Sequence, residues 1–270
     1  KLFGKRCIAT IHGLDWQRAK WGGFATRYLK FGEWVAARFS DELIVLTEGA
    51  QQYFRDTYGR ESTVIPNGVE RPEVVEPAMI RNKYGLEKDG YILFLGRIVP
   101  EKGIQYLIDA YSRLNTDKKL VIAGGSSDTS DFMADLKRRT ENNKNVIFTG
   151  FVKGRLLSEL FSNAYIYALP SDLEGMPLSL LEAMSYGTCS LISDIEACTS
   201  VVADPATGKR WASVFRKSDV DDLQKTLQRL IDNPAEVQEI RSGCADFICN
   251  KYSWDEVFEK TAELYQKKGA

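Results

Sequence analysis

The segment 170-PSDLEGMPLSLLEAMSYGTCSLIS-193 decides the fold of this chain. It joins a polar loop carrying Glu174 to an amphipathic helix, with Glu182 about two turns inside it, and then to an apolar strand. Pro177 suits the first helical turn because its missing N–H would be unpaired there. The free N–H groups and the dipole of a helix start favour an anion. The segment therefore predicts a site for a ligand with a central diphosphate and hydroxyl-rich groups on either side, the shape of a nucleotide-sugar.

Short apolar runs alternate with helical patterns along most of the chain. Candidate strands lie at 7–11, 42–47, 62–66, 91–96, 119–124, 145–150, 165–169, 189–193 and 212–215. Helical patterns lie near 24–39, 48–58, 103–114, 129–142, 154–162, 178–187, 219–232, 234–250 and 254–268. Such alternation predicts βαβ units and a parallel sheet, and runs without strict polar alternation indicate strands covered on both faces. We predict an α/β fold with a doubly wound parallel sheet.

The composition excludes several classes of protein. Hydrophobic residues make up 44% and charged residues 27% of the chain, and its formal net charge is −1, so the charge gives no case for a nucleic-acid partner. The five cysteines show no CxxC or Cys/His metal spacing, which predicts reduced cysteines in a cytoplasmic protein and no metal site.

A second informative stretch is 94-FLGRIVPEKGIQYLIDAY-111. A buried strand is predicted to end at Gly96, and the short loop after it carries Arg97 and Lys102. Ligands of open α/β sheets bind outside the carboxyl ends of the strands, so both cations are expected where a phosphate would lie. A guanidinium fork and a flexible ammonium both suit phosphate oxygens. Taken alone, this stretch could equally be a solvated loop.

The two glutamates of the first segment are not spaced for hydrolysis of a glycosidic bond. On one helix, Glu174 and Glu182 would lie about 12 Å apart. Retaining glycosidases need about 5–5.5 Å and inverting ones about 6.5–9.5 Å. Binding roles on two parts of one ligand fit the spacing better. The glycine-ended strands at 121–128 and 149–152 are weaker signals, each of which could be a plain turn.

The N-terminal part carries the only histidine and a basic, aromatic segment. His12 follows a predicted strand and either enters a site or is structural. Residues 16–39 could contact an anionic membrane peripherally or hold a phosphorylated acceptor, but a solvated amphipathic helix with a buried aromatic face fits as well.

Together, these stretches resemble glycosyltransferases of the GT-B fold, in the large family four of mostly retaining nucleotide-sugar transferases. GRIVPEKG at 96–103, FTGFV at 148–152 and the Glu174–Glu182 pair match its donor domain, while TIHGLD at 10–15 and VIPNGV at 64–69 match its acceptor domain and hinge. The run HGLDWQRAKWGG is similar to bacterial transferases of cell-surface polysaccharides, rhamnosyltransferases among them.

The resemblance implies three regions. Residues 70–250 would form the Rossmann-like donor-binding domain, and residues 1–69 the C-terminal part of a second Rossmann-like, acceptor-side domain. Residues 251–270 would be a helix that crosses back to the acceptor domain. The chain starts without methionine, and the part before residue 70 supplies only three strands. We therefore expect an N-terminal truncation of about a hundred residues, of the order of a small domain.

The resemblance also implies roles. Arg97 and Lys102 would hold the diphosphate, Glu174 would contact the transferred sugar, and His12 would face the reacting centre. Glu182 would bind the ribose hydroxyls. Further donor contacts implied are Gly96, Phe151, Val152, Gly175, Met176, Leu178 and Ser179. No cofactor or metal is expected beside the nucleoside-diphosphate sugar, which serves as donor substrate.

The expected activity is metal-independent transfer of a hexosyl or deoxyhexosyl group to a hydroxyl of a polysaccharide or lipid-linked intermediate. The expected location is the cytoplasm, with peripheral attachment to the inner face of the membrane. Two alternatives stay open: a GT-B nucleotide-sugar epimerase, and a fragment that binds donor without catalysis. The chain departs from the family pattern at Ser200, where an acidic residue is usual, and at 211-WASVF-215, where a glycine often precedes the last strand.

Overall fold

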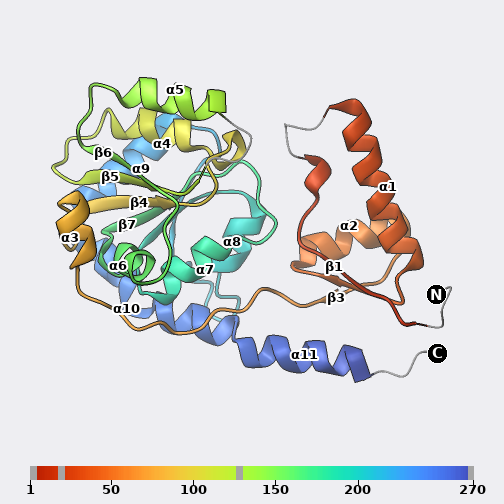
Figure 1. The fold of residues 1–270 in the computed structure, drawn as a ribbon. Helices are drawn as coiled ribbons and strands as arrows, with labels where there is room; N and C mark the ends of the chain where they lie inside the picture. The colour runs from red at the N-terminus through yellow and green to blue at the C-terminus, as the bar shows by residue number, and fades with distance from the viewer. Residues whose placement is uncertain (1–4, 18–21, 126–129, 267–270) are drawn as a thin grey trace. The chain divides into compact units, whose positions relative to one another are not determined.

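The computed structural model describes residues 5–17, 22–125 and 130–266. The chain divides into two compact units (Figure 1). The first unit comprises Lys1–Val69, Leu173–Pro177 and Tyr252–Ala270, and the second comprises Glu70–Asp172 and Leu178–Lys251. The first unit is therefore built from three separate stretches of sequence, and the second from two.

The second unit is organised around a six-stranded parallel sheet. Its strands are β4 (Tyr91–Leu95), β5 (Lys119–Ala123), β6 (Val146–Gly150), β7 (Ile166–Leu169), β8 (Ser190–Ser193) and β9 (Ser213–Phe215), in the order β6-β5-β4-β7-β8-β9. This is a doubly wound Rossmann-type order, in which the direction of strand addition reverses between β4 and β7. The six strands predicted for residues 91–215 are confirmed.

Helices cover both faces of this sheet (Figure 1). The helices α4 (Ile104–Tyr111), α5 (Ser130–Thr140) and α9 (Val220–Asp232) lie on one face. The helices α6 (Arg155–Asn163), α7 (Leu178–Ser185) and α10 (Pro234–Lys251) lie on the other. The central strands β7 and β8 are buried along their whole length and β4 up to Phe94, which explains their apolar sequences. The short helices α3 (Met79–Tyr84) and α8 (Glu196–Val202) complete the unit.

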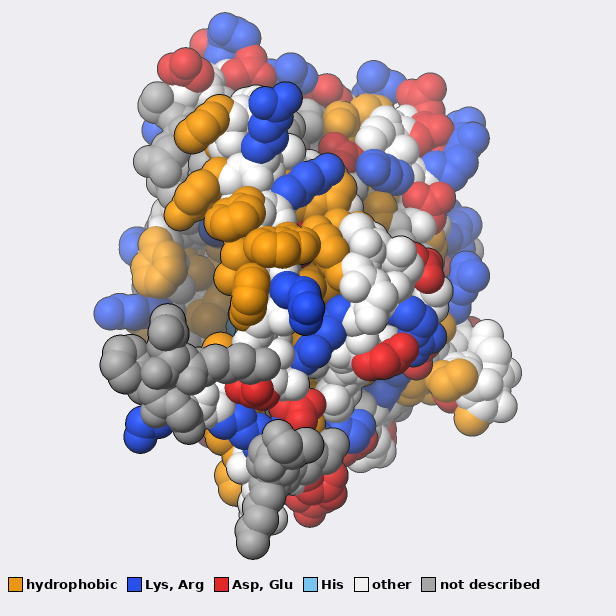
Figure 2. Space-filling view, turned by 90° about the vertical axis from the view of Figure 1, so that its right-hand side faces the viewer, with side chains coloured by type: hydrophobic (Ala, Val, Ile, Leu, Met, Phe, Trp, Pro, Cys, Tyr) orange, Lys and Arg blue, Asp and Glu red, His pale blue; other side chains and the backbone are white. Residues whose placement is uncertain are grey.

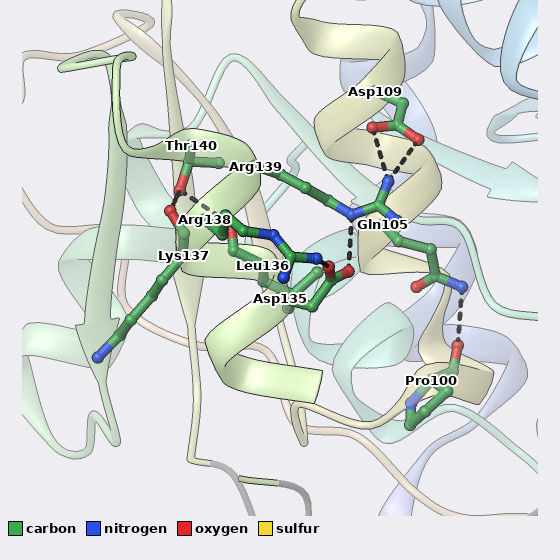
Figure 3. Close-up of polar contacts among 9 residues, drawn as sticks. All are labelled: Pro100, Gln105, Asp109, Asp135, Leu136, Lys137, Arg138, Arg139 and Thr140. Carbon is green, nitrogen blue, oxygen red and sulfur yellow. Dashed lines mark hydrogen bonds and ion pairs between the residues drawn. The ribbon is translucent and has the colours of Figure 1, made fainter. Parts of the chain in front are cut away.

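An arginine clamp joins α4 to α5 (Figure 3). Arg139 of α5 donates to both carboxylate oxygens of Asp109 of α4, at 3.1 and 3.0 Å, and to Asp135 of its own helix at 2.7 Å. One turn before Asp109 on α4, Gln105 donates to the carbonyl oxygen of Pro100 at 3.3 Å. Pro100 begins the short 3-10 turn η2 (Pro100–Lys102), so α4 anchors the loop that carries Lys102.

The first unit contains a three-stranded parallel sheet in the order β1-β2-β3, with β1 (Ile8–Ile11), β2 (Glu42–Val45) and β3 (Thr63–Val64). The alternate residues Leu43 and Val45 of β2 pack with α1 (Gly23–Phe39) and α2 (Glu48–Tyr58). Ile44, which points to the opposite face, packs with Leu264 of α11 (Trp254–Gln266). The sheet is thus covered on both faces, and α11 belongs to this unit.

Candidate functional site

The strand order of the second unit identifies where a ligand can bind. Because the sheet reverses between β4 and β7, the segments that leave the carboxyl ends of these two paired strands diverge to opposite faces. The segment after β4 carries Gly96, Arg97 and Lys102, and the segment after β7 begins at Pro170. Two cations predicted from the sequence therefore follow a strand that borders the switch point.

Close backbone packing fixes the loop after β4. A Cβ atom at position 124 would lie 1.8 Å from the carbonyl oxygen of Gly96, so the segment after β5 requires glycine there. The backbone N–H of Gly96 donates to the carbonyl oxygen of Ala123 at 3.0 Å, and that of Ile98 donates to the carbonyl oxygen of Gly125 at 3.0 Å. Between these two bonds Arg97 is exposed, and its guanidinium has no hydrogen-bond or ion-pair partner among the described residues. The loop is held by its backbone while the Arg97 side chain is left available to an anion.

The loop after β7 is tied to the loop after β4. Gly103, in the left-handed conformation with φ 66°, lies against Pro170, since a Cβ atom at position 103 would be 1.9 Å from the carbonyl oxygen of Pro170. The backbone N–H of Asp172 donates to the backbone carbonyl oxygen of Glu101 at 2.8 Å. Glu101 and the partly buried Lys102 share the turn η2, so these contacts fix the segment that carries Lys102 against the start of the β7 loop.

Asp172 is a functional candidate that sequence reasoning missed. Its carboxylate accepts hydrogen bonds from Tyr106 of α4 at 3.0 Å and from Ser218 at 2.6 Å. Ser218 itself has a positive φ of 59° and ends the turn after β9. Asp172 therefore holds together segments that follow three different strands. Its place in the segment 170–193 was visible, but neither partner is close to it in the sequence.

Helix α7 presents Ser179 and Glu182. The helix begins at Leu178, so Glu182 is its fifth residue and lies about one turn inside, not two as expected from the sequence. The Ser179 hydroxyl lies 2.7 Å from the Tyr167 hydroxyl of β7, which fixes the first turn of the helix to the sheet. Leu178 is 51% exposed, and Pro177 directly precedes the helix.

Glu182 is partly buried, and burial raises its pKa above the ordinary value. No described residue donates a hydrogen bond to its carboxylate or pairs with it. A partly desolvated acceptor without a protein donor is suited to accept hydrogen bonds from a ligand's hydroxyl groups.

The loop after β6 lies two strands from β4. Gly150 ends the strand with φ 71°, Phe151 is 78% exposed, and Val152 is buried. Two strand spacings correspond to about 10 Å. The Phe151–Val152 backbone therefore lies along the same sheet edge as the Arg97 loop but apart from it. This separation lets the two loops contact opposite ends of one extended ligand. Residues 126–128 of the predicted 121–128 stretch lie outside the described residues.

The other predicted residues form a group within the first unit. His12 directly follows β1 and is exposed. Gly175 packs on the backbone after that strand, because a Cβ atom at position 175 would be 2.4 Å from the carbonyl oxygen of His12. The backbone N–H of Asn67, after β3, lies 3.2 Å from the sulfur of Met176. The segment with Glu174, Gly175 and Met176 is thus seated on the carboxyl-end loops of β1 and β3.

A buried carboxylate supports the loop after His12. Glu33 of α1 accepts from the Trp16 indole at 3.0 Å and from the phenols of Tyr53 and Tyr58 at 2.7 and 2.6 Å. Trp16 belongs to the short 3-10 turn η1 (Asp15–Gln17) that follows His12. No local sequence pattern signals this network, because its donors come from separate elements. Within the described parts of the chain, no group of His, Cys, Asp and Glu residues could hold a metal ion.

The predicted site residues therefore fall into two groups, each within one unit. The second unit carries Gly96, Arg97, Lys102, Phe151, Val152, Leu178, Ser179 and Glu182. The first unit carries His12, Glu174, Gly175 and Met176.

Comparison with known proteins supplies an independent line of evidence. Residues 78–246 match the family described as glycosyl transferases group 1, and residues 1–70 match a domain of unknown function, DUF1972. An uncharacterized glycosyltransferase of Methanocaldococcus jannaschii is 31% identical over 194 residues, which cover 71% of this chain and 48% of that protein. The UDP-Gal:alpha-D-GlcNAc-diphosphoundecaprenol alpha-1,3-galactosyltransferase of Escherichia coli is 25% identical over 98% of this chain and 70% of its own length.

Solved structures agree on the fold. The HepE protein of Anabaena, crystallised with UDP and glucose, superposes with a TM-score of 0.84 at 17% identity, over 98% of this chain and 72% of that one. The chain spans about half the length of several curated relatives that it matches. Its fold is of the GT-B type, with two units that each contain a parallel sheet. Since the family match extends over more than half of its residues, the chain belongs to the group 1 glycosyltransferase family.

Proposed function

We propose that this protein transfers a glycosyl group from a nucleoside-diphosphate sugar to an acceptor hydroxyl. The observation that carries the proposal is the loop after β4, which offers Arg97 and Lys102 beside the switch point of a doubly wound sheet. Membership of the group 1 glycosyltransferases supports it. The HepE complexes with UDP support a nucleotide donor as the ligand class.

The donor diphosphate is bound, in this proposal, by Arg97, Lys102 and the N–H groups around Gly175–Ser179. Negative charge grows on the diphosphate as the sugar–phosphate bond breaks, and fixed donors that face this charge lower the barrier. A bound divalent ion is then not needed for that role. Glu182 accepts hydrogen bonds from the ribose hydroxyls, and the backbone at Phe151–Val152 contacts the base. Glu174 contacts the sugar, and His12 faces the reacting carbon.

The bond changes balance without a protein nucleophile. The bond between the anomeric carbon and the diphosphate oxygen breaks, and its electron pair leaves with the nucleoside diphosphate. The acceptor oxygen forms the new bond to the same carbon, and its proton passes to the departing phosphate. Attack on the face from which the phosphate leaves retains the configuration.

We place the acceptor hydroxyl on a polysaccharide or lipid-linked intermediate and the transferred group among hexoses or deoxyhexoses, rhamnose included. The name of the Escherichia coli relative, a galactosyltransferase acting on a diphosphoundecaprenol-linked sugar, supports this acceptor class. A lipid-linked acceptor is presented at a membrane, so the proposal includes peripheral attachment at the cytoplasmic face through residues 16–39. Within that segment Arg18, Lys20 and Trp21 lie outside the described residues.

Titration calorimetry with UDP, dTDP and GDP tests the donor site directly on this chain. We expect one of the three to bind, and Arg97→Ala or Lys102→Ala to weaken its binding about ten- to a hundredfold, the loss of a hydrogen bond to a charged group. Lys88→Ala is the matched control, because Lys88 is exposed and precedes β4, at the opposite end of the same strand. Equal affinity of all four proteins would refute the assignment.

A further inference from the structure

The outer face of α1 is aromatic and exposed. Phe24 is 87% exposed, Tyr28 70% and Phe31 59%, and the pattern continues through Phe39 at 52%. These residues recur at three- and four-residue spacing, together with Val35, so they share one side of the helix. Trp34 adds a flank, stacked on Phe31 with ring centroids 5.7 Å apart. The alternative of a buried aromatic face is therefore wrong for this helix.

The inner face of α1 is firmly held, which leaves the outer face in a fixed position. Ala37 is buried in the core formed with β2 and α2. Glu33, 8% exposed, is fixed by its three hydrogen bonds from Trp16, Tyr53 and Tyr58. Because these contacts lie on the side opposite Phe24 and Phe31, α1 cannot turn its aromatic side chains inward without breaking them.

Positive charge accompanies the aromatic stripe, and negative charge does not. Arg27 and Arg38 are exposed along its edge. The single acidic residue between 16 and 39 is Glu33, which points into the core. Figure 2 shows hydrophobic side chains gathered beside lysine and arginine side chains on one face of the molecule.

We propose that the outer face of α1 docks on the surface of an anionic lipid bilayer, with α1 lying in the plane of the interface. Aromatic rings settle at the boundary of headgroups and acyl chains, while arginine and lysine contact lipid phosphates. No described helix is both long and apolar enough to span a membrane. The charge pattern favours this occupant over a second copy of the chain, since two cationic faces would repel each other.

The outer face of α1 supplies the residues for the peripheral attachment included in the proposed function, but its docking does not depend on donor binding. Every residue that it uses is in the first unit, and the diphosphate-binding cations Arg97 and Lys102 are in the second. Loss of vesicle binding with intact nucleotide binding, and the reverse, are therefore separate results.

Co-sedimentation with large vesicles tests the docking. We expect the chain to bind vesicles of phosphatidylcholine with about 30% phosphatidylglycerol, as a test composition for an anionic surface, and to bind pure phosphatidylcholine far more weakly. Added salt should weaken binding. Phe24→Ser with Phe31→Ser should lower the partition coefficient by about tenfold or more. Arg27→Gln with Arg38→Gln should lower it by about fivefold for each charge.

Matched controls separate the face from general hydrophobicity and charge. Phe258→Ser on α11 removes a phenylalanine that is 72% exposed. Lys88→Gln with Lys225→Gln removes two exposed charges from the second unit. Both controls should bind vesicles like the parent, and all variants should keep its circular dichroism and melting temperature.

A second measurement locates the contact. Lipids brominated near the headgroup should quench tryptophan fluorescence of the vesicle-bound chain, and Trp34→Phe should remove a large part of this quenching. Equal binding to neutral vesicles, unchanged binding of the Phe24/Phe31 variant, or self-association of the chain that excludes vesicles would each overturn the proposal.

Discussion

Gly103 lies against Pro170, so that a methyl group on Gly103 would meet the carbonyl oxygen of Pro170 at 1.9 Å. This contact joins the loops that follow β4 and β7, the two strands at which the sheet reverses. We expect Gly103→Ala to lower the stability of the second unit by about 3 kcal/mol or more. The left-handed conformation alone costs a non-glycine residue about 1–2 kcal/mol, and the clash adds to it.

Gly187→Ala isolates the conformational part of this cost. Gly187 lies in the same unit and also has a positive φ, 75°, but a Cβ atom added at this position would have no other atom within 4 Å. Urea denaturation of both variants gives the two free energies of unfolding. If Gly103→Ala were no more destabilising than Gly187→Ala, the contact with Pro170 would not hold the two loops together.

Glu182→Gln should separate stability from binding. The pKa of Glu182 is raised by burial, so the folded state prefers the neutral carboxyl group. The stability that the protonated carboxyl group contributes is lost as the pH rises through the pKa of the folded state. The neutral glutamine should therefore stabilise the free protein at pH 7 and have no such advantage at pH 4. Binding of the nucleoside diphosphate should weaken about ten- to a hundredfold, because an amide replaces a charged acceptor of the ribose hydroxyls.

Thermal melts from pH 4 to pH 8, with and without nucleotide, measure both effects. Glu73→Gln, at an exposed glutamate of the same unit, is the control and should change neither. A Glu182→Gln protein that binds nucleotide as tightly as the parent would remove Glu182 from the site.

Asp172→Ala should weaken nucleotide binding although Asp172 is not assigned to the ligand. Its carboxylate fixes the β7 loop through Tyr106 and Ser218, and loosening that loop reduces the preorganisation of the cations beside it. We expect about a three- to tenfold loss of affinity by calorimetry. Asp204→Ala also removes a loop-fixing carboxylate, one that accepts from Ala206 and Thr207, and should leave affinity unchanged. Equal effects of the two substitutions would mean that Asp172 acts only on general stability.

Tyr58→Phe tests the carboxylate network of the first unit. Burial and the hydrogen bond to Glu33 raise the pKa of Tyr58. The stabilising contribution of the neutral phenol is complete below about pH 10, where an unfolded tyrosine ionises, and is lost as the pH rises further. At pH 7 the variant should be about 1.5–3 kcal/mol less stable than the parent, and the difference should shrink above pH 10.

Denaturant titrations at pH 7 and pH 11 check this prediction. Tyr28→Phe, at a tyrosine that is 70% exposed, should match the parent at both values. A constant difference between Tyr58→Phe and the parent across this range would show that the phenol proton does not matter.

The strands of the second unit were predictable because they follow from local signals. Each of its strands is a short apolar run separated from the next by a helical pattern, and parallel connections leave few alternative topologies. Helix α3 was not predicted, because a remote residue caps its first turn. Glu159 of α6 accepts from the backbone of Ala78 and Ile80, at 2.9 and 3.1 Å, and the N-cap residue Ala78 makes no side-chain cap of its own.

The charged side chains proposed for the site were chosen from local sequence, whereas the residues that hold their loops in place were not found from the sequence. Arg97 was singled out because it follows an apolar strand, at the edge where open α/β sheets bind ligands, and Glu182 because it shares one segment with Glu174. Asp172 and Glu33 work through partners up to 66 residues away in the sequence, and no local pattern encodes such a distance. The exposed side of α1 shows the same limit, since an amphipathic pattern does not reveal which face meets the core.

The three-part composition of the first unit has a consequence for synthesis on the ribosome. Leu264 of α11, near the end of the chain, completes the core that also contains Ile44 and Ile65. Every residue of the second unit has been translated by Lys251, before α11 begins. The second unit can therefore mature on the nascent chain while the first still lacks one cover of its sheet. Emergence of α11, and not the emergence of β1, sets the earliest time at which the first unit is finished.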